Sequence, residues 1–174
     1  NRLMNAPNGA TISGGGNSDR PNIAAHYYTV IGGGYGNEAE GYGSTIAGGM
    51  DNKTSGGGAT IGGGDNNEAI GNQSTVGGGG GNIAQGDAST VPGGAGNAAL
   101  GRFSFAAGRR AKANHQGAFV WADATDADFA STTNNQFSVR AIGGVRFSLN
   151  PEGQGLRLIP SSISPNILAG HLDN

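Results

Sequence analysis

Isoleucine and valine recur at a fixed spacing of fifteen residues through the middle of the chain. In most units the preceding residue is threonine, and the residue before that is small. This short alternation predicts a strand in each unit, with the isoleucine or valine facing inward and the threonine facing outward. The inward column is Ile31, Ile46, Ile61, Val76 and Val91, and the outward threonines are Thr45, Thr60, Thr75 and Thr90.

Glycine and asparagine follow the same spacing. A pair of glycines follows each isoleucine or valine, and it supplies turns that other residues would reach only with strain. A second strand is expected around the segment Asn-x-Ala-x-Gly. The asparagines are expected to form a structural ladder, because stacked asparagines hydrogen-bond along a cross-β axis; a binding stripe is the alternative. These residues are Asn37, Asn52, Asn67, Asn82 and Asn97.

A repeat this short predicts a solenoid. We assign residues 1–118 to an array of 15-residue coils, of which about seven can be recognised between residues 10 and 118. One buried isoleucine or valine per coil makes a thin core, which offsets little of the entropy lost on ordering the coil. We therefore expect several stacks to associate side by side as an oligomer.

The pattern changes after the array. Residues 119–150 contain the single tryptophan, and two alternating runs around Gly143 and Gly144 predict a β-hairpin. We therefore expect a β-rich, neck-like cap that closes the array. Residues 151–174 are interpreted as a linker leading into a further coil.

The two ends of the chain are also expected to be related. Ile167–Asn174 resembles Ile46–Asn52, and Asn1–Gly9 resembles the remainder of such a coil. Together the two ends would make about one coil. This suggests one segment of a longer tandem polypeptide, or a subunit that joins head to tail.

Composition narrows the function classes. Glycine supplies 36 of the 174 residues, yet it falls in columns, which argues against disorder, and not at every third position, which excludes collagen. A net charge near −2 gives no general reason to expect nucleic acid as a partner. The chain has no cysteine and no apolar stretch long enough for a membrane span.

The segment Ser104–Gly117 carries a family resemblance. Its sequence, Ser-Phe-Ala-Ala-Gly-Arg-Arg-Ala-Lys-Ala followed by Gly117, resembles the head repeat of the YadA-like trimeric autotransporter adhesins. Residues 117–147 also resemble sequence that follows such arrays in bacterial surface and phage tail-fibre-like proteins. The resemblance implies an all-β fold, a left-handed parallel β-roll whose three copies pack around a threefold axis. It also implies an extracellular or cell-surface location and attachment to host matrix or cell surfaces.

Four basic residues gather where the array meets the expected cap. They form a candidate site for a polyanion such as a sulfated glycan. The alternative is pairing across chains with Asp123, Asp126 and Asp128, which would contribute little to stability if the pairs are exposed. The basic residues are Arg102, Arg109, Arg110 and Lys112.

The sequence gives weaker support to calcium binding, ice binding and catalysis. Asp51 and Asp65 are the acidic residues near the turns, too few for a repeated calcium site. The outward threonines resemble the rank of an ice-binding solenoid, but Phe105 interrupts them. His26, His115 and His171 lie far apart, with no nucleophile–base constellation nearby. We therefore expect no catalytic residues, no cofactor and no metal.

These observations favour a non-enzymatic extracellular fibre or adhesin head that displays repeated faces for attachment. Its partners would be two further copies of itself, and a host matrix protein or cell-surface glycan. The main alternative is a self-assembling structural filament or tail-fibre shaft built by head-to-tail contacts. An ice- or glycan-binding solenoid is a third hypothesis.

Overall fold

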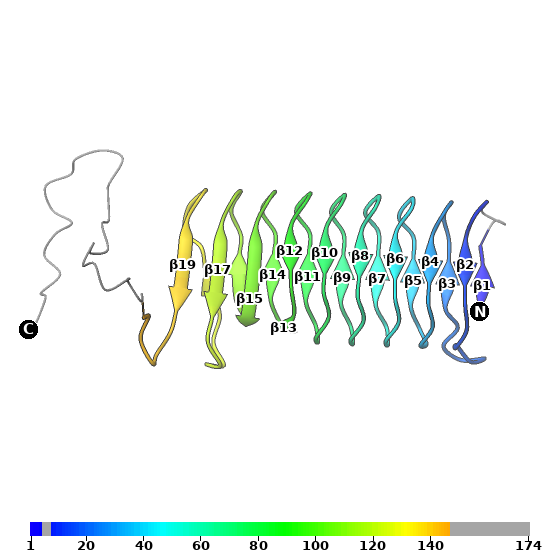
Figure 1. Cartoon of the computed structure of the whole chain (residues 1–174), viewed down its shortest axis with the longest axis horizontal. Helices are drawn as coiled ribbons and strands as arrows, with labels where there is room; N and C mark the ends of the chain where they lie inside the picture. Colours follow the sequence, from blue (N-terminus) through cyan, green and yellow to red (C-terminus); the bar gives the residue numbers. More distant parts are fainter. Residues whose placement is uncertain (5–7, 147–174) are drawn as a thin grey trace, which may run out of the picture. The chain divides into compact units, whose positions relative to one another are not determined.

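The computed structural model describes residues 1–4 and 8–146, and these form an all-β parallel solenoid of about nine coils without a helix (Figure 1). Each coil contributes one strand to each of two parallel sheets. Sheet A runs through β1 (Arg2–Leu3), β3 (Ile23–Ala24), β5 (Glu38–Ala39), β7 (Lys53–Thr54), β9 (Glu68–Ala69), β11 (Ile83–Ala84), β14 (Ala98–Ala99), β16 (Ala111–Ala113) and β18 (Phe129–Ala130).

Sheet B lies opposite sheet A. It runs through β2 (Thr11–Ile12), β4 (Val30–Ile31), β6 (Thr45–Ile46), β8 (Thr60–Ile61), β10 (Thr75–Val76), β12 (Thr90–Val91), β15 (Phe105–Arg109), β17 (Phe119–Ala122) and β19 (Phe137–Arg140). The short strand β13 (Gly94–Ala95) also pairs with β15. We call the turns from sheet A to sheet B the A-to-B edge, and those from sheet B to sheet A the B-to-A edge.

The register of the parallel strands places residues of the same type next to one another in successive coils. Thr60 pairs with Thr45 on one side and with Thr75 on the other. Ile61 likewise lies between Ile46 and Val76. A parallel ladder in which every coil repeats the same residue types gives each side chain an identical neighbour above and below. The pairing is thereby fixed, because a slip by one residue would turn the apolar column outward.

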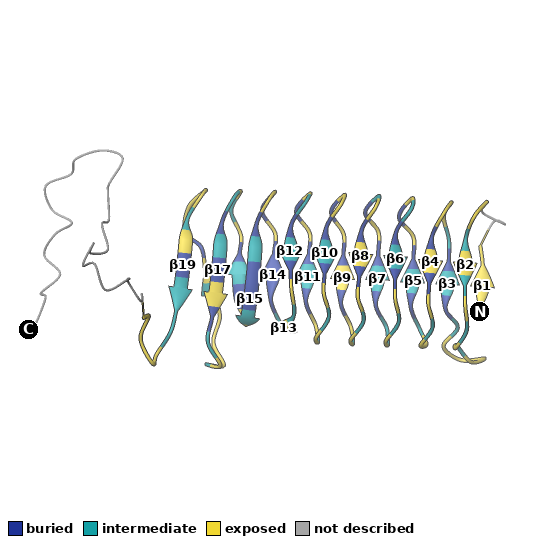
Figure 2. Cartoon of the chain, viewed as in Figure 1, coloured by how far each residue is buried: buried dark blue, intermediate teal, exposed yellow. Residues whose placement is uncertain are grey.

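The core is a narrow seam between the two sheets. The inward isoleucines and valines from β4 to β12 of sheet B are fully buried and face a column of alanines from sheet A (Figure 2). Small alanines allow the sheets to approach closely, and the threonines point outward as the alternation predicted. The fully buried column residues are Ile31, Ile46, Ile61, Val76 and Val91, with Ala24, Ala39, Ala69, Ala84 and Ala99 opposite.

The stack continues beyond the predicted end of the array. β17 pairs in parallel with β15, and β19 pairs in parallel with β17. The predicted hairpin around Gly143 and Gly144 was therefore wrong for the described residues: its first run is a further solenoid strand, and Ile142–Arg146 contains no strand. An open parallel strand edge offers unpaired backbone groups, which the next segment satisfies by adding another coil.

Compact unit 1 comprises Asn1–Ile142, and unit 2 comprises Gly143–Asn174. All the strands of the described residues belong to unit 1. The expected linker and further coil at residues 151–174 lie outside the described residues.

A column of small residues at the A-to-B edge contains buried hydroxyl groups that have no hydrogen-bond partner among the described residues. Ser74, Ser89 and Ser104 are buried, and their hydroxyl groups have no hydrogen-bond partner among the described residues. Ala59 occupies the same column and is also fully buried, so the site accepts a methyl group. Ser44 differs because its Oγ accepts a hydrogen bond of 2.8 Å from Thr54 Oγ1.

Replacing one of these unsatisfied serines should stabilise the fold. We expect Ser89→Ala to raise the free energy of unfolding by about 1 kcal/mol, because a buried hydroxyl without a partner is removed. Ser44→Ala is the matched control and should lower it by a similar amount, since Thr54 loses its acceptor. Urea denaturation followed by circular dichroism measures both changes; equal destabilisation by the two substitutions would contradict the assignment.

Candidate interaction surfaces

The asparagine column lies inside the solenoid and cannot line a surface stripe. Each of the five side chains is at most 1% exposed. Asn67 is representative: its Nδ2 donates to the carbonyls of Gly63 at 3.1 Å and Gly79 at 2.9 Å, and its Oδ1 accepts from the Asn82 N–H at 3.0 Å. The column therefore ties each turn to the next coil. It is a structural ladder, not a ligand site.

Two rows of outward positions run along sheet B without a charged residue. We call this surface the sheet B face. It consists of two adjoining rows, and neither row contains a lysine, arginine, aspartate or glutamate. The first row is Thr11, Val30, Thr45, Thr60, Thr75, Thr90, Phe105, Phe119 and Phe137, and the second is Ser13, Gly32, Ala47, Gly62, Gly77, Pro92, Ala107, Trp121 and Val139.

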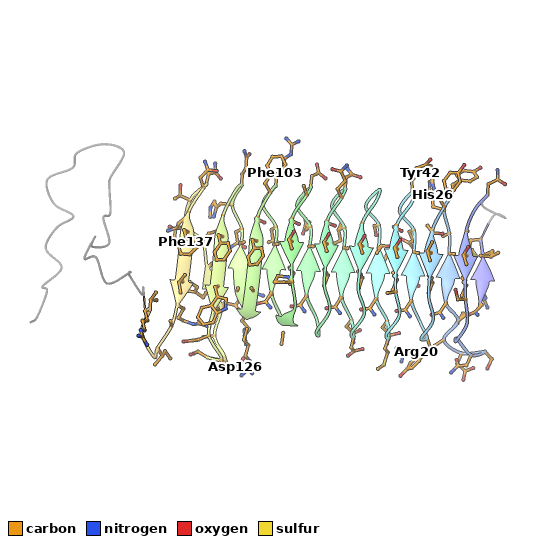
Figure 3. The ribbon with its side chains drawn as sticks, viewed as in Figure 1. Arg20, His26, Tyr42, Phe103, Asp126 and Phe137 are labelled. Carbon is orange, nitrogen blue, oxygen red and sulfur yellow. The ribbon has the colours of Figure 1, made fainter. Side chains whose placement is uncertain are left out.

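The sheet B face becomes aromatic at its carboxyl-terminal end. Phe105 and Phe119 stack with ring centroids 4.6 Å apart and planes 2° apart, and Phe119 and Phe137 stack at 4.8 Å and 18°. Phe137 is 69% exposed (Figures 2 and 3). Such a ladder forms because parallel register places equivalent side chains directly above one another. It is a large exposed apolar surface that sequence reasoning treated only as an interruption of the threonine rank.

An apolar groove of about 440 Å³ adjoins this aromatic end. The lining includes Gly94, Gly108, Trp121 and Ala122, together with the charged residues Arg109 and Asp123. Trp121 is 38% exposed and lies in the second row of the sheet B face. The groove therefore extends the apolar part of this face toward the B-to-A edge.

The outward surface of sheet A is charged. Lys53 in β7 reaches Glu38 at 3.1 Å and Glu40 at 3.0 Å. The hydrogen bond that Lys53 donates to the Glu40 carboxylate, opposed by partial desolvation, leaves the pKa of Lys53 raised. The outward positions thus differ in chemical character: Glu38, Lys53 and Glu68 lie along sheet A, whereas the charged residues of the sheet B strands are Arg109 and Arg140 at the carboxyl ends of β15 and β19.

The predicted polyanion site is not assembled as one cluster. Arg110 pairs with Asp128 at 2.7 Å and with Asp126 at 3.2 Å, and Arg109 pairs with Asp126 at 3.0 Å. Hydrogen bonding to Asp128 raises the pKa of Arg110, and the same contact lowers the pKa of the Asp128 carboxyl. The alternative of arginine–aspartate pairing therefore occurs here, but within one chain rather than across chains.

The other two basic residues lie elsewhere. Lys112 donates to the backbone carbonyl of Gly96 at 2.6 Å. The Arg102 guanidinium lies over the Phe103 ring at 4.5 Å. Phe103 lies on the A-to-B edge, across the solenoid from Asp126 (Figure 3). Arg102 is therefore separated from the arginine–aspartate cluster by the thickness of the solenoid.

Asp123 accepts hydrogen bonds that hold the last described coil against the coil before it. Its carboxylate accepts hydrogen bonds from the Ile142 N–H at 2.8 Å, the Thr125 N–H at 3.1 Å and Arg140 Nε at 3.0 Å. The Ile142 N–H, followed by the contacts with Thr125 and Arg140, holds the pKa of Asp123 well below its usual range. The ionised side chain, just after β17, therefore ties that coil to Arg140 and Ile142 at the end of β19 in the next coil.

The histidines are separated, as their sequence positions imply. His115 Nδ1 lies 2.8 Å from Ser131 Oγ, which also accepts from the Asn114 N–H at 3.0 Å. His26 belongs to a group of exposed tyrosines on the A-to-B edge that sequence reasoning missed. The predicted position His171 lies outside the described residues.

Within residues 1–4 and 8–146, no group of three or more histidine, aspartate or glutamate side chains is placed to hold a metal ion. That part of the chain also contains no helix with the length and hydropathy of a membrane span.

Sequence comparisons give no family. No protein-family model matches this chain, and no curated protein is significantly similar to it.

Proposed function

We propose that this chain is a non-enzymatic, extracellular fibre segment or adhesin head, in which three left-handed rolls of 15-residue coils pack their sheet B faces together. The observation that carries the proposal is the sheet B face, which is uncharged and ends in a stack of three phenylalanines, of which Phe137 is exposed and Phe105 and Phe119 are partly buried. The parallel stacking of the coils and the resemblance of Ser104–Gly117 to YadA-like head repeats support it.

The physical argument concerns apolar burial. A solenoid with one buried aliphatic side chain per coil leaves Phe137 and Trp121 in contact with water. Burying such side chains against another copy removes apolar surface from water, at roughly 25 cal/mol per Å². Sheet A has no comparable surface, because its outward strands carry Glu38, Lys53 and Glu68. Three copies in this arrangement would display three identical outer faces, and weak contacts would add through avidity.

Molar mass in solution tests the proposal. We expect light scattering to give a mass of three chains that does not change over a wide concentration range. Phe137→Glu should reduce the mass to one chain, because a carboxylate would be buried in the apolar contact. Most of the Phe137 ring is exposed in a single chain, so the substitution itself costs the isolated roll little.

Leu100→Glu is the matched control. Leu100 is also an exposed apolar residue, but it follows β14 of sheet A. This variant should keep the mass of three chains. A one-chain mass for the unaltered protein at every concentration would exclude the proposed packing.

A head-to-tail filament is the second candidate. It is favoured by the resemblance of Ile167–Asn174 and Asn1–Gly9 to the two parts of one coil, and by β1 and β2 standing last in their sheets among the described residues. Free strand edges accept further strands from another chain. A molar mass that increases continuously with concentration would favour this alternative.

A further inference from the structure

Four aromatic side chains gather on the A-to-B edge near the amino-terminal end of the solenoid (Figure 3). We call them the tyrosine cluster: His26, Tyr27, Tyr28 and Tyr42. The three tyrosines are 48%, 54% and 57% exposed, respectively. His26 meets Tyr27 and Tyr42 edge to face, with ring centroids 5.6 and 5.8 Å apart, and Tyr28 meets Tyr42 in the same way at 5.6 Å.

The backbone beneath the cluster is held by the solenoid. The Tyr27 carbonyl accepts a hydrogen bond from the Gly43 N–H at 2.9 Å, and the Tyr42 carbonyl accepts one from the Gly58 N–H at 2.8 Å. The Tyr28 N–H donates to the Asn8 carbonyl at 3.0 Å. These turns are therefore fixed by the same ladder that builds the fold. A ligand would meet rings whose positions are already restricted, which reduces the entropy lost on binding.

The coil next to Tyr42 has glycine at the turn position equivalent to Tyr42 and at the position after it. Gly57 occupies the position equivalent to Tyr42 and is followed by Gly58, and the coil beyond places Asn72 and Gln73 there. Asn72 Oδ1 accepts a hydrogen bond of 3.0 Å from the Gly57 N–H. With neighbouring strands about 4.8 Å apart, Tyr42 and Asn72 flank roughly 10 Å of bare backbone. We call Gly57 and Gly58 the bare step.

Successive coils of this edge therefore present aromatic rings, then two glycines, then two amide side chains. Tyrosine offers a flat apolar face together with a hydroxyl group at its rim. Gln73 offers an amide donor and acceptor; the Asn72 amide already accepts from one backbone N–H and donates to the Asp87 carboxylate at 3.3 Å, and keeps one further N–H and one oxygen lone pair for a ligand. The tyrosine cluster and these two residues include no lysine or arginine, and the nearby Glu40 is paired with Lys53 at 3.0 Å. The chemistry fits a ligand with an apolar face and a rim of uncharged hydroxyl groups.

We propose that the tyrosine cluster and the bare step bind a neutral pyranose unit of a glycan. The C–H face of the sugar ring stacks on Tyr42, and the sugar hydroxyls bond to the amides of Asn72 and Gln73. The inference rests on the proposed attachment function, for which it supplies the ligand class. The site lies on a turn edge, so packing of the sheet B faces leaves it on a different surface of each chain.

The test uses a defined panel of sugars: the methyl glycosides of glucose, galactose and mannose, N-acetylglucosamine, lactose and cellobiose, with sialyllactose and a heparin tetrasaccharide as anionic probes. Saturation-transfer NMR identifies binding, and titration of the tyrosine resonances gives the dissociation constant. We expect at least one neutral sugar to bind and to shift the resonances of the cluster. Binding of the anionic probes alone, or of no sugar, would overturn the proposal.

Three variants locate the site. Tyr42→Ala should weaken binding about tenfold, which corresponds to the loss of one aromatic stacking contact. Gly57→Gln should also weaken binding, because it fills the bare step without altering a tyrosine; the φ of Gly57 lies outside the left-handed region and its Cβ position is free of backbone overlap. Phe103→Ala is the matched control, an exposed aromatic residue on the same edge that should leave binding unchanged. Unchanged binding by Tyr42→Ala would refute the assignment.

The molar mass of the same samples separates this inference from the proposed function. Three chains per particle without sugar binding would refute the glycan site alone. A single chain that binds sugar through Tyr42 would refute the trimer and retain the site.

Discussion

Asn67→Ala should destabilise the protein by about 3–5 kcal/mol or prevent it from folding. The side chain is fully buried. Its loss leaves the Gly63 carbonyl and the Asn82 N–H without their partners, since both bond to Asn67 among the described residues. The Gly79 carbonyl is less affected because it also accepts from the Asp65 N–H at 2.9 Å. Two orphaned backbone groups and a cavity account for the expected loss.

The experiment compares thermal and urea unfolding by circular dichroism. Asn72→Ala is the matched control: Asn72 also accepts a backbone hydrogen bond from the neighbouring coil, but it lies on an exposed turn where water replaces the lost acceptor. We expect this variant to lose less than about 1 kcal/mol. Equal losses for the two variants would show that burial of the ladder is unimportant.

Asn67→Asp provides a second measurement at the same position. The change keeps the size of the side chain but replaces the amide donor with a carboxylate facing the Gly63 and Gly79 carbonyls. Burying that unpaired charge beside two carbonyl oxygens is strongly unfavourable. Destabilisation at least equal to that of Asn67→Ala would assign the effect to hydrogen bonding rather than to lost volume.

Gly79→Ala is the second substitution with a large expected effect. Gly79 has a φ of +86°, and a Cβ built there would overlap the backbone carbonyl oxygen of Gly94 in the next coil. The neighbouring coil cannot move away without breaking the parallel ladder. We therefore expect the free energy of unfolding to fall by more than about 3 kcal/mol.

Gly81→Ala separates steric overlap from backbone strain. Gly81 belongs to the same turn and also has a left-handed backbone, with φ of +62°, but nothing lies within 4 Å of its Cβ position. Its substitution should cost only about 1–2 kcal/mol, the usual price of a left-handed alanine. Denaturation midpoints of the two variants measure the difference. If Gly81→Ala were as damaging as Gly79→Ala, close approach of the coils would not explain the glycine column.

The two proposed interaction surfaces arise from different parts of the repeat. Strand positions repeat closely, and their outward residues make the continuous sheet B face. Turn positions on the A-to-B edge vary from coil to coil, from Tyr42 through Gly57 to Asn72. A solenoid can change such exposed turn residues without disturbing the ladder beneath them. We therefore assign trimer assembly to the regular sheet B face, and glycan binding to the variable turns of the A-to-B edge.

The sequence by itself determined the parallel solenoid, the inward Ile46 column and the alternation of strand and glycine turn. These features depend on short-range chemistry that every coil repeats, so the pattern is visible without knowledge of the partners. The hairpin prediction was wrong because the coils after Ala118 differ in length, which hides the repeat: Phe119 pairs with Phe105 on one side and with Phe137 on the other, across turns of unequal size. Longer turns shift the columns in the sequence but leave the strand pairing intact.

Only the tertiary structure decided which residues meet across coils. It joined Arg110 to Asp126 and Asp128, and it placed Arg102 on the opposite edge. It also stacked the three phenylalanines and gathered Tyr42 with His26, contacts between residues of different coils. The spacing of a repeat predicts that equivalent positions stack. Which edge a turn residue occupies, and what lies beside it, depends on how each coil closes.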